Sequence, residues 1–422
     1  MNMTRMVMMT ILSILMVLVF KFSFLLGTFC PIMYTKWWLF SSFSILMSLS
    51  ALMMVLVLML LASPSGSYYL LLLSSGLIPV MFFNSGHWAT MLIFYELSLV
   101  PISWMILILG KQPERLRASR FILLYTVLFS VPFILSLQTL MEKFNVLWVW
   151  ELTMLVYFFD LPSFCGWGMG LGFLVKVPMI FLHYWLPKAH VEASTSGSVL
   201  LAGVLLKMGA LGLYQLSFLF SSLYGAMLWW ILLGLSAVGG GLAALQALLA
   251  TDMKIIVALA SVSHMNFSLT VYTVLTILST KSFIMYNFAH SVVSSSLFFL
   301  VSEMYAQSNS RSILMNKGKA SSTPIKWVAY LLWAANMSLP PFMSFIAEIL
   351  GLMSVSTMSI FVVAPVLTYI ILSSLYSVMN MVVLTGSKPS GIGTKMSIKS
   401  GLTFFVLIMI PFVSTWSTMS FS

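Results

Sequence analysis

Long apolar runs follow one another through this 422-residue sequence. Hydrophobic residues fill 61% of its positions and charged residues only 7%, which is more apolar surface than a soluble core can bury. At about 1.5 Å per helical residue, a run of roughly 20 residues crosses the hydrocarbon layer of a membrane. The sequence therefore predicts an all-α polytopic membrane protein rather than a soluble domain.

Thirteen of these runs are long enough to be transmembrane helices. The first run lacks the cleavage site of a signal peptide and further spans follow at once, so we interpret it as a helix. The aromatic-rich segment 142–162 is expected to lie outside the membrane, on its interface. The thirteen expected ranges are 6–26, 38–62, 67–83, 88–110, 120–141, 163–184, 193–217, 223–248, 252–276, 281–302, 325–352, 357–385 and 399–418.

The net charge of +11 comes from lysines and arginines that are divided unevenly between the two sides of this arrangement. No basic, aromatic-interleaved surface accompanies them, so we expect no nucleic-acid partner. An excess of basic loop residues marks the inner side of a membrane protein, which puts the N-terminus inside and the C-terminus outside. The basic residues expected inside are Arg5, Lys111, Arg115, Arg117, Arg120, Lys188, Lys254, Arg311, Lys317, Lys319, Lys326, Lys388, Lys395 and Lys399, and those outside are Lys21, Lys36, Lys143 and Lys281.

Six ionisable residues interrupt six different spans. A lysine at the centre of a span costs about 2.5–3.5 kcal/mol on insertion scales. Because Lys176 and Lys207 lie inside consecutive spans, the chain is expected to use their charge. The full set of candidate residues is Glu96, Lys176, Lys207, His264, His290 and Glu348.

Prolines beside two of these charges predict broken helices. Pro178 follows Lys176 and cannot donate to the carbonyl of residue 174, and the pair Pro340–Pro341 frees two further carbonyls ahead of Glu348. Unpaired carbonyls at membrane depth need protein groups or trapped water as partners. Each break should therefore carry a polar patch.

The two broken spans lie five helices apart, and an odd offset inverts the direction of a span. We therefore expect two inverted five-helix repeats, each with a broken helix, as in secondary transporters. In this division residues 1–66 form N-terminal helices, 67–217 the first repeat, 223–385 the second repeat, and 386–422 a C-terminal loop and helix.

The six residues suit proton movement, because buried lysine, glutamate and histidine can exchange protons near neutral pH. The two histidines could equally be packing residues without a function. A zinc site of His183, His190 and Glu192 is a further alternative, but the spacing matches no usual zinc motif.

The sequence offers no ligands for a redox cofactor. Cys30 and Cys165 are too few for a cluster held by four thiolates, and they form no haem-attachment motif. No dinucleotide-binding glycine motif follows a strand. If redox chemistry is involved, this chain is not expected to hold the cofactor.

Several segments resemble a known family, the antiporter-like membrane subunits of mitochondrial NADH–ubiquinone oxidoreductase (respiratory complex I), and among them the chain 4 subunits. The resemblance covers roughly residues 90–350, and the most specific segment is HYWLPKAHVEAS followed by AGVLLK. The matching segments are ELSLVP (96–101), GKQPERLRA (110–118), HYWLPKAHVEAS (183–194), SVLLAGVLLKMGALG (198–212), TDMKIIVALASVSHM (251–265), AHSVVSSSLFF (289–299) and LPPFMSFIAE (339–348).

This resemblance implies about fourteen helices and a hydrophilic axis that carries protons across the mitochondrial inner membrane. Electron transfer from NADH to quinone elsewhere in the complex would drive it, with FMN, iron–sulfur clusters and ubiquinone in other subunits. The implied partners are neighbouring antiporter-like subunits, accessory subunits and lipids, including cardiolipin. By motif, Glu96 lies beside the first channel, Lys176 on the first broken helix, Lys207 between the channels, His264 and His290 along the relay, and Glu348 on the second broken helix.

Two alternatives to this reading remain. A subunit of a related multisubunit cation/proton antiporter would share the axis and work without NADH, although the segment QPERL argues against it. A scaffold that has lost pumping is the other, and the intact charged set argues against that. The chain also departs from the family, because Ser194 and Ser344 stand where the family has proline and asparagine.

Overall fold

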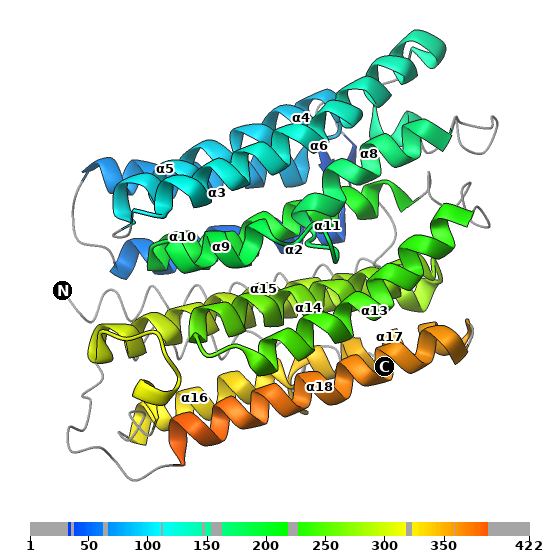
Figure 1. Cartoon of the computed structure of the whole chain (residues 1–422). Coiled ribbons are helices and arrows are strands. Elements are labelled where there is room, and N and C mark those ends of the chain that lie inside the picture. Colours follow the sequence, from blue (N-terminus) through cyan, green and yellow to red (C-terminus); the bar gives the residue numbers. More distant parts are fainter. Residues whose placement is uncertain are drawn as a thin grey trace.

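The computed structural model describes most of the chain between residues 33 and 386. Two short strands, β1 (Met33–Tyr34) and β2 (Leu39–Phe40), pair antiparallel ahead of the first described helix. Helices make up nearly all of the rest, and they lie roughly side by side along one direction (Figure 1). The described residues are 33–34, 38–61, 66–110, 113–145, 148–152, 163–217, 227–317, 323–358 and 360–386.

The first group of helices corresponds to the predicted spans between residues 38 and 217. Two of its spans, Trp88–Leu109 and Thr195–Gln215, each join consecutive helical segments into one continuous helix. The elements are α2 (Ser42–Leu61), α3 (Gly66–Asn84), α4 (Trp88–Leu97), α5 (Leu99–Leu109), α6 (Arg115–Phe144), α8 (Ser163–Lys176), α9 (Trp185–Glu192), α10 (Thr195–Leu200), the π-helical η1 (Leu201–Leu205) and α11 (Leu206–Gln215).

The second group follows in the same manner. A short 3-10 helix, η2 (Leu314–Asn316), lies between its third and fourth spans. The helices are α13 (Met227–Leu249), α14 (Met253–Thr273), α15 (Ile277–Ser308), α16 (Thr323–Asn336), α17 (Met343–Ser356) and α18 (Ile360–Thr385).

Two helix starts in the first group are explained by local side chains. The His87 ring accepts a hydrogen bond from the Ala89 amide (3.2 Å) at the start of α4, and burial lowers the pKa of His87, which keeps that ring nitrogen free to accept. Ser194 caps α10 by accepting from the Gly197 amide (3.3 Å). The Ser194 side chain therefore stabilises the start of α10.

The two predicted breaks are confirmed. α8 ends at Lys176 and α9 begins at Trp185, while α16 ends at Asn336 and α17 begins at Met343. Each break falls in the fourth span of its set of five. The prolines that interrupt the backbone therefore place an irregular segment at the same position in both sets.

The predicted spans from 38–62 to 357–385 all correspond to helices in the structure. Nine continuous helices in the described ranges are long and apolar enough to cross a membrane, and the two broken helices complete the predicted eleven. The predicted spans 6–26 and 399–418 lie outside the described residues, as does most of segment 142–162 and of segment 386–422. The four-part domain division stays a prediction.

The two groups meet where α9, α10, η1 and α11 pack against α14 and α15. These central helices are almost wholly enclosed: every residue of the most apolar stretches of Thr195–Gln215 and Ile277–Ser308 is buried, against about a third for α3, α6 and α18. The functional candidates on α11, α14 and α15 therefore lie deep in the protein, away from lipid.

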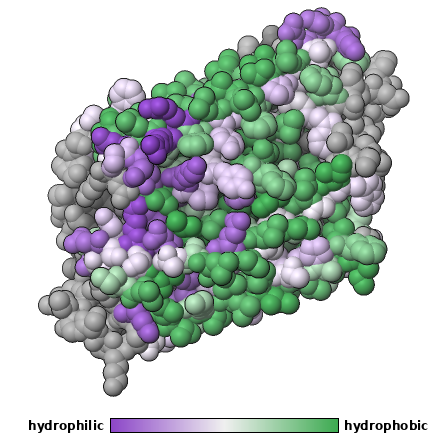
Figure 2. Space-filling model, viewed as in Figure 1, coloured by the Kyte–Doolittle hydropathy of each residue, from purple (hydrophilic) through white to green (hydrophobic). Residues whose placement is uncertain are grey.

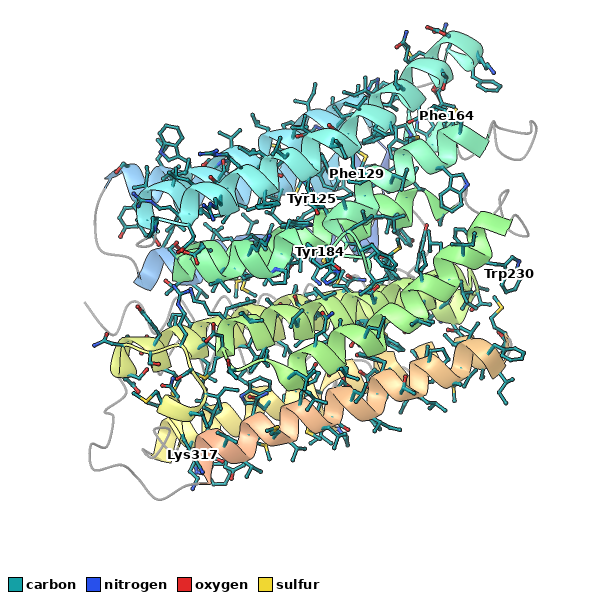
Figure 3. The ribbon with its side chains drawn as sticks, viewed as in Figure 1. Tyr125, Phe129, Phe164, Tyr184, Trp230 and Lys317 are labelled. Carbon is teal, nitrogen blue, oxygen red and sulfur yellow. The ribbon has the colours of Figure 1, made fainter. Side chains whose placement is uncertain are left out.

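The outer surface is apolar over most of its height. Hydrophobic residues cover the middle of the face in Figure 2, and hydrophilic residues gather toward the end where α6 and α14 begin. Exposed aromatic side chains such as Phe164, Tyr184 and Trp230 lie on this outer surface (Figure 3). This distribution is expected of a surface that faces lipid.

Candidate functional site

Lys176 is the last residue of α8, and its side chain is buried beside the junction of α4 and α5. Its ammonium donates to the Tyr95 carbonyl (2.7 Å) and to the Ser98 hydroxyl (3.2 Å). It also lies 3.4 Å from the centre of the Tyr95 ring. Tyr95, through its carbonyl and its ring, and Ser98 therefore stabilise a charge on a side chain that is only 1% exposed.

Glu96 lies next to Tyr95 on α4. It interacts electrostatically with Lys176, but within the described ranges the two make no ion pair at 4.0 Å or less. One Glu96 carboxylate oxygen is buried and accepts no hydrogen bond from the described residues. The structure thus places these two charges near each other, and this Glu96 oxygen can still accept a hydrogen bond.

The break after Lys176 is stabilised by side chains from other segments. Asn266 on α14 donates to the Pro178 carbonyl (3.0 Å) and accepts from the Ile180 amide (3.3 Å). Trp185 donates its indole N–H to the Val175 carbonyl (3.1 Å). The predicted polar patch at this break therefore exists, and protein groups supply part of it.

Lys207 lies on α11, directly after the π-helical turn η1, and has no exposed surface. Its ammonium lies 2.8 Å from Nδ1 of His290 on α15 and 3.2 Å from the Met265 sulfur. A π-helical turn shifts the register of a helix and is frequent at functional sites. Here it precedes the residue that joins the two groups of helices.

His264 is the centre of a second cluster. Its Nδ1 lies 2.6 Å from the hydroxyls of both Tyr286 and Tyr369, which are 2.8 Å from each other. Its Nε2 lies 3.2 Å from the Asn336 side-chain oxygen and 3.1 Å from the Tyr376 hydroxyl. Both ring nitrogens therefore have partners that can pass or hold a proton.

Glu348 on α17 completes this cluster from the second broken helix. Its carboxylate accepts from the Ser338 hydroxyl (2.7 Å) and from the Tyr286 hydroxyl (3.4 Å). Ser344 donates to the Ala335 carbonyl (3.1 Å), so this serine also stabilises the break between α16 and α17. Tyr286 thus connects Glu348 directly to His264.

Between His264 and His290 the structure holds a small cavity. The centres of the two rings lie 5.7 Å apart, and among the described residues no hydrogen bond joins them. The cavity of about 10 Å³ is lined by both histidines together with Tyr286, Asn336 and Ser338. That is about the space of one water molecule, and the polar lining offers it several partners.

All six predicted residues thus lie in two clusters. Glu96 and Lys176 form one, and Lys207, His290, His264 and Glu348 are connected in the other. In the described part of the chain no hydrogen bond joins Lys176 to Lys207, although α8 packs directly on α11.

Sequence reasoning missed the tyrosines and amides of these clusters. A signal existed for Tyr286, which precedes His290 by four residues and so shares its helix face. Tyr369 and Tyr376 are seven apart on α18, which places them on one face as well. Asn266 and Asn336 lie on helices that already carried a candidate.

Lys188 and Glu192, which lie outside the predicted spans, belong to a helix, and so does Lys254, which is counted with the basic loop residues although the predicted span 252–276 includes it. Lys188 and Glu192 lie on α9, because the broken span continues beyond its break. Lys254 lies in the first turn of α14 and is only 8% exposed. Its ammonium binds the Ala193 carbonyl (2.9 Å) and the Val191 carbonyl (3.3 Å) at the end of α9.

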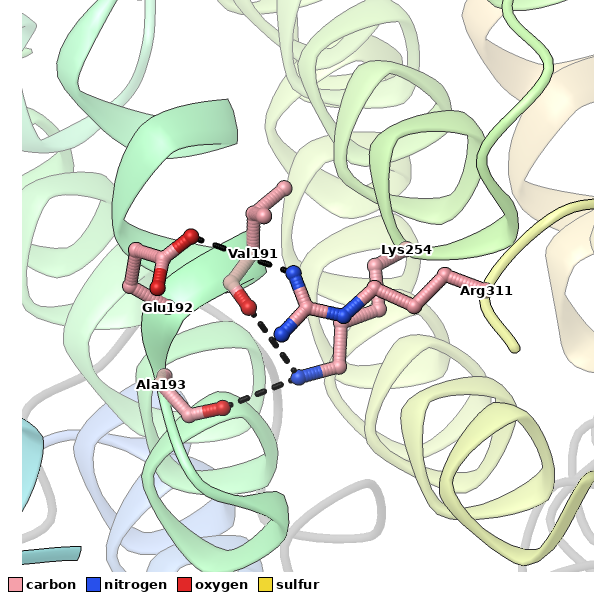
Figure 4. Close-up of polar contacts among 5 residues, drawn as sticks. All are labelled: Val191, Glu192, Ala193, Lys254 and Arg311. Carbon is pink, nitrogen blue, oxygen red and sulfur yellow. Dashed lines mark hydrogen bonds and ion pairs between the residues drawn. The ribbon is translucent and has the colours of Figure 1, made fainter. Parts of the chain in front are cut away.

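An ion pair lies beside this contact. Arg311, in the segment after α15, pairs with Glu192 at 3.8 Å, as Figure 4 shows together with the Lys254 contacts. These interactions join the end of the first broken helix to α14 and to the loop after α15. The two groups of helices are therefore connected at the protein surface as well as through Lys207 and His290.

The chain is similar to known proteins in both sequence and fold. A family model described as NADH:quinone oxidoreductase/Mrp antiporter, transmembrane, matches residues 85–373. NADH-ubiquinone oxidoreductase chain 4 of Ceratitis capitata is 37% identical over 283 residues, which cover 66% of this chain and 62% of that protein. The chain 4 protein of Artemia franciscana is 36% identical, with 67% of this chain and 71% of that protein covered. The match spans about three fifths of the length of the first two relatives, at 62% and 59%.

Solved structures share the fold. A chain of respiratory complex I from Thermus thermophilus with bound NADH superposes with a TM-score of 0.80 at 20% identity, covering 97% of this chain and 92% of that one. A chain of the Mrp complex from Dietzia sp. superposes with a TM-score of 0.79 at 18% identity, covering 89% of this chain and 43% of that one. At this identity the likeness concerns the arrangement of helices.

Proposed function

We propose a function from one premise: this chain belongs to the NADH:quinone oxidoreductase/Mrp antiporter transmembrane family and, within it, to the chain 4 subunits of NADH–ubiquinone oxidoreductase. The chain is a proton-translocating subunit in the membrane arm of respiratory complex I. Electron transfer from NADH to ubiquinone takes place at a distance and drives proton movement in this subunit. Its location is the mitochondrial inner membrane, which it crosses many times.

One observation carries this proposal. Lys207, His290, His264, Tyr286 and Glu348 form a buried polar row that runs from the boundary between the two groups of helices into the second group, interrupted only by a cavity the size of one water. Burying so many polar groups is costly unless they act together, and a row of proton donors and acceptors is what a relay requires.

The proposed role in redox chemistry is indirect. The chain contributes to a proton-translocating NADH:ubiquinone oxidoreductase as a subunit and carries no redox centre of its own. FMN, iron–sulfur clusters and ubiquinone belong to other subunits. The proposed partners are the neighbouring antiporter-like subunits, accessory subunits and membrane lipids, including cardiolipin.

The test is the substitution Lys207→Ala in the assembled complex. Lys207 contacts His290 across the boundary between the two groups of helices, so its loss should lower NADH-driven proton pumping by about tenfold or more while assembly persists. Pumping and NADH oxidation are measured in membrane vesicles, and assembly by native electrophoresis with an NADH dehydrogenase stain. A variant with full turnover and full pumping would refute the role.

The same gel separates the alternative function. A subunit of a multisubunit cation/proton antiporter has this fold too, as the Mrp superposition shows. Migration of the chain with the large NADH-oxidising band supports the proposal, whereas migration in a smaller assembly without NADH activity supports the antiporter.

A further inference from the structure

His190, on α9, is a fully buried histidine that the proposed relay does not use. It has no exposed surface, and neither ring nitrogen has a hydrogen-bond partner among the described residues. Its ring stacks on Phe298 of α15 with the centres 4.2 Å apart and the planes 3° from parallel. Leaving polar atoms of a buried group unpaired is costly. Stacking therefore fixes the imidazole, while its two nitrogens have no hydrogen-bond partner among the described residues. Such nitrogens are available to bind and release a proton.

A cleft reaches from the protein surface toward this region. It has a volume of about 440 Å³, lies between α6, α9 and α14, and has Glu114, Lys188 and Glu192 in its lining. Glu114 and Lys188 are exposed and mark its outer rim, whereas the Glu192 side chain is only 10% exposed and lies further in. Hydrophilic residues gather at this end of the molecule (Figure 2). The cleft therefore gives water access to the Glu192 carboxylate.

Charged and polar side chains of the described ranges lie between the cleft and the relay, without direct contact between successive members as far as His290. Glu192 interacts electrostatically with Lys254, and Lys254 with His190. His190 interacts in the same way with His290, which contacts Lys207 at 2.8 Å. One ring nitrogen of His290, Nε2, is buried and without a partner in the described part of the chain. The Phe298 ring on which His190 stacks lies about two turns from His290 on α15, so both histidines lie beside this helix.

We propose that this cleft is the mouth of a lateral proton-uptake route, in which Glu192 takes a proton from water and His190 delivers it to His290. The inference rests on the proposed function. A proton that arrives on one ring nitrogen of His190 leaves from the other, so the imidazole returns to its starting charge. Water inside the protein would complete the steps, since the side chains do not touch one another.

Lys254 acts as a positioning residue in this route. Its ammonium fixes the end of α9 through the Val191 and Ala193 carbonyls (Figure 4), and so restrains the turn of the helix that carries His190 and Glu192. Arg311 restrains Glu192 from the other side. The route therefore enters at the boundary between the two groups of helices and bypasses Lys176.

A purely structural role for His190 makes a different prediction. If the ring only fills space against Phe298, then His190→Phe, which keeps an aromatic ring in the stack, should be silent. If the ring carries protons, the same substitution should be harmful although the packing is retained. Phe298→Leu is the matched control, because it removes the stack and leaves the imidazole.

The experiment uses membrane vesicles that contain the complex assembled with each variant chain, and it measures the initial rate of NADH-driven proton uptake. We expect His190→Phe and Glu192→Gln to lower this rate by about tenfold, and Phe298→Leu to leave it near the wild-type value. Native electrophoresis measures assembly. Where His190→Phe assembles poorly, His190→Gln, which is smaller and polar, is measured in its place.

Lys207→Ala serves as the reference in the same vesicles. If the His190→Phe variant takes up protons at the wild-type rate while the Lys207→Ala variant takes them up slowly, the lateral route is overturned and the proposed function stands. Full uptake in Lys207→Ala instead overturns the proposed function. An equal loss in Phe298→Leu and His190→Phe also rejects the route, because packing would then explain both.

Discussion

At the scale of single residues, the contacts of His264 predict redundancy. Tyr286 and Tyr369 both place a hydroxyl 2.6 Å from the same ring nitrogen and lie 2.8 Å from each other. Either hydroxyl can therefore take over when the other is lost. We expect Tyr286→Phe and Tyr369→Phe each to reduce proton pumping by less than about threefold, and the double variant by more than about tenfold. Pumping by the complex in vesicles is the measurement.

The matched control lies on the other side of the same ring. Tyr376→Phe removes a hydroxyl from Nε2, where Asn336 remains as a second partner. The double variant with Tyr369→Phe removes one partner from each ring nitrogen of His264, and its loss of proton pumping should remain small. A double variant of Tyr286 and Tyr369 that pumps no worse than the product of its single variants would show that the two hydroxyls act independently.

At the scale of elements, the packing of α11 on α8 depends on glycine. A Cβ on Gly209 would lie 2.7 Å from Cγ2 of Val177 and 2.9 Å from the Phe173 carbonyl, and the backbone cannot move away easily. Gly209→Ala should therefore destabilise the protein by about 1–3 kcal/mol and displace the break next to Lys176. Gly203, on the same continuous helix, has no neighbour nearer than 3.4 Å and should accept alanine.

The measurement for this pair is thermal unfolding of the complex in detergent, combined with proton pumping in vesicles. Gly209→Ala is expected to unfold at a lower temperature and to pump more slowly than Gly203→Ala. Equal stability of the two variants would mean that the close approach of α11 to α8 is absent from the folded protein.

The elements also show which parts of the site were predictable. The two helix breaks could be predicted, because a proline removes a hydrogen bond wherever it occurs and its effect is local. A charge in an apolar run is costly and therefore easy to recognise in the sequence, so the sequence could also predict Lys176, Lys207 and Glu348. Tyr286 and Asn266 were not predictable, since neither residue type carries such a cost, and each finds partners on helices distant in sequence.

Lys254 shows a second kind of limit. A lysine near a helix end is expected to extend its ammonium into water. Here the end of α9, more than sixty residues earlier, presents two free carbonyls at that position and binds the ammonium instead. Which helix ends meet is decided by the tertiary arrangement, so no local pattern could have placed this residue.

At the scale of the whole molecule, the distribution of basic residues predicts orientation in the membrane. α6 begins with Arg115 and Arg117 at one end and reaches Lys143 in its last turn, so these charges lie on opposite sides. Lys317 lies in the loop after α15, at the end where α6 begins (Figure 3). Because basic loops stay inside, Lys317 should face the inner compartment and Lys143 the outer one.

Cysteine labelling tests this orientation in intact inner membranes. In a chain with Cys30→Ser and the buried Cys165 retained, Lys143→Cys should react with a membrane-impermeant maleimide from outside, because Lys143 is exposed. Lys317→Cys, also at an exposed position, should react only after the membrane is opened. The reverse labelling pattern would show that the chain has the opposite orientation in the membrane. The cleft at Glu192, which lies at the same end as Lys317, would then take up protons from the outer compartment instead of the inner one.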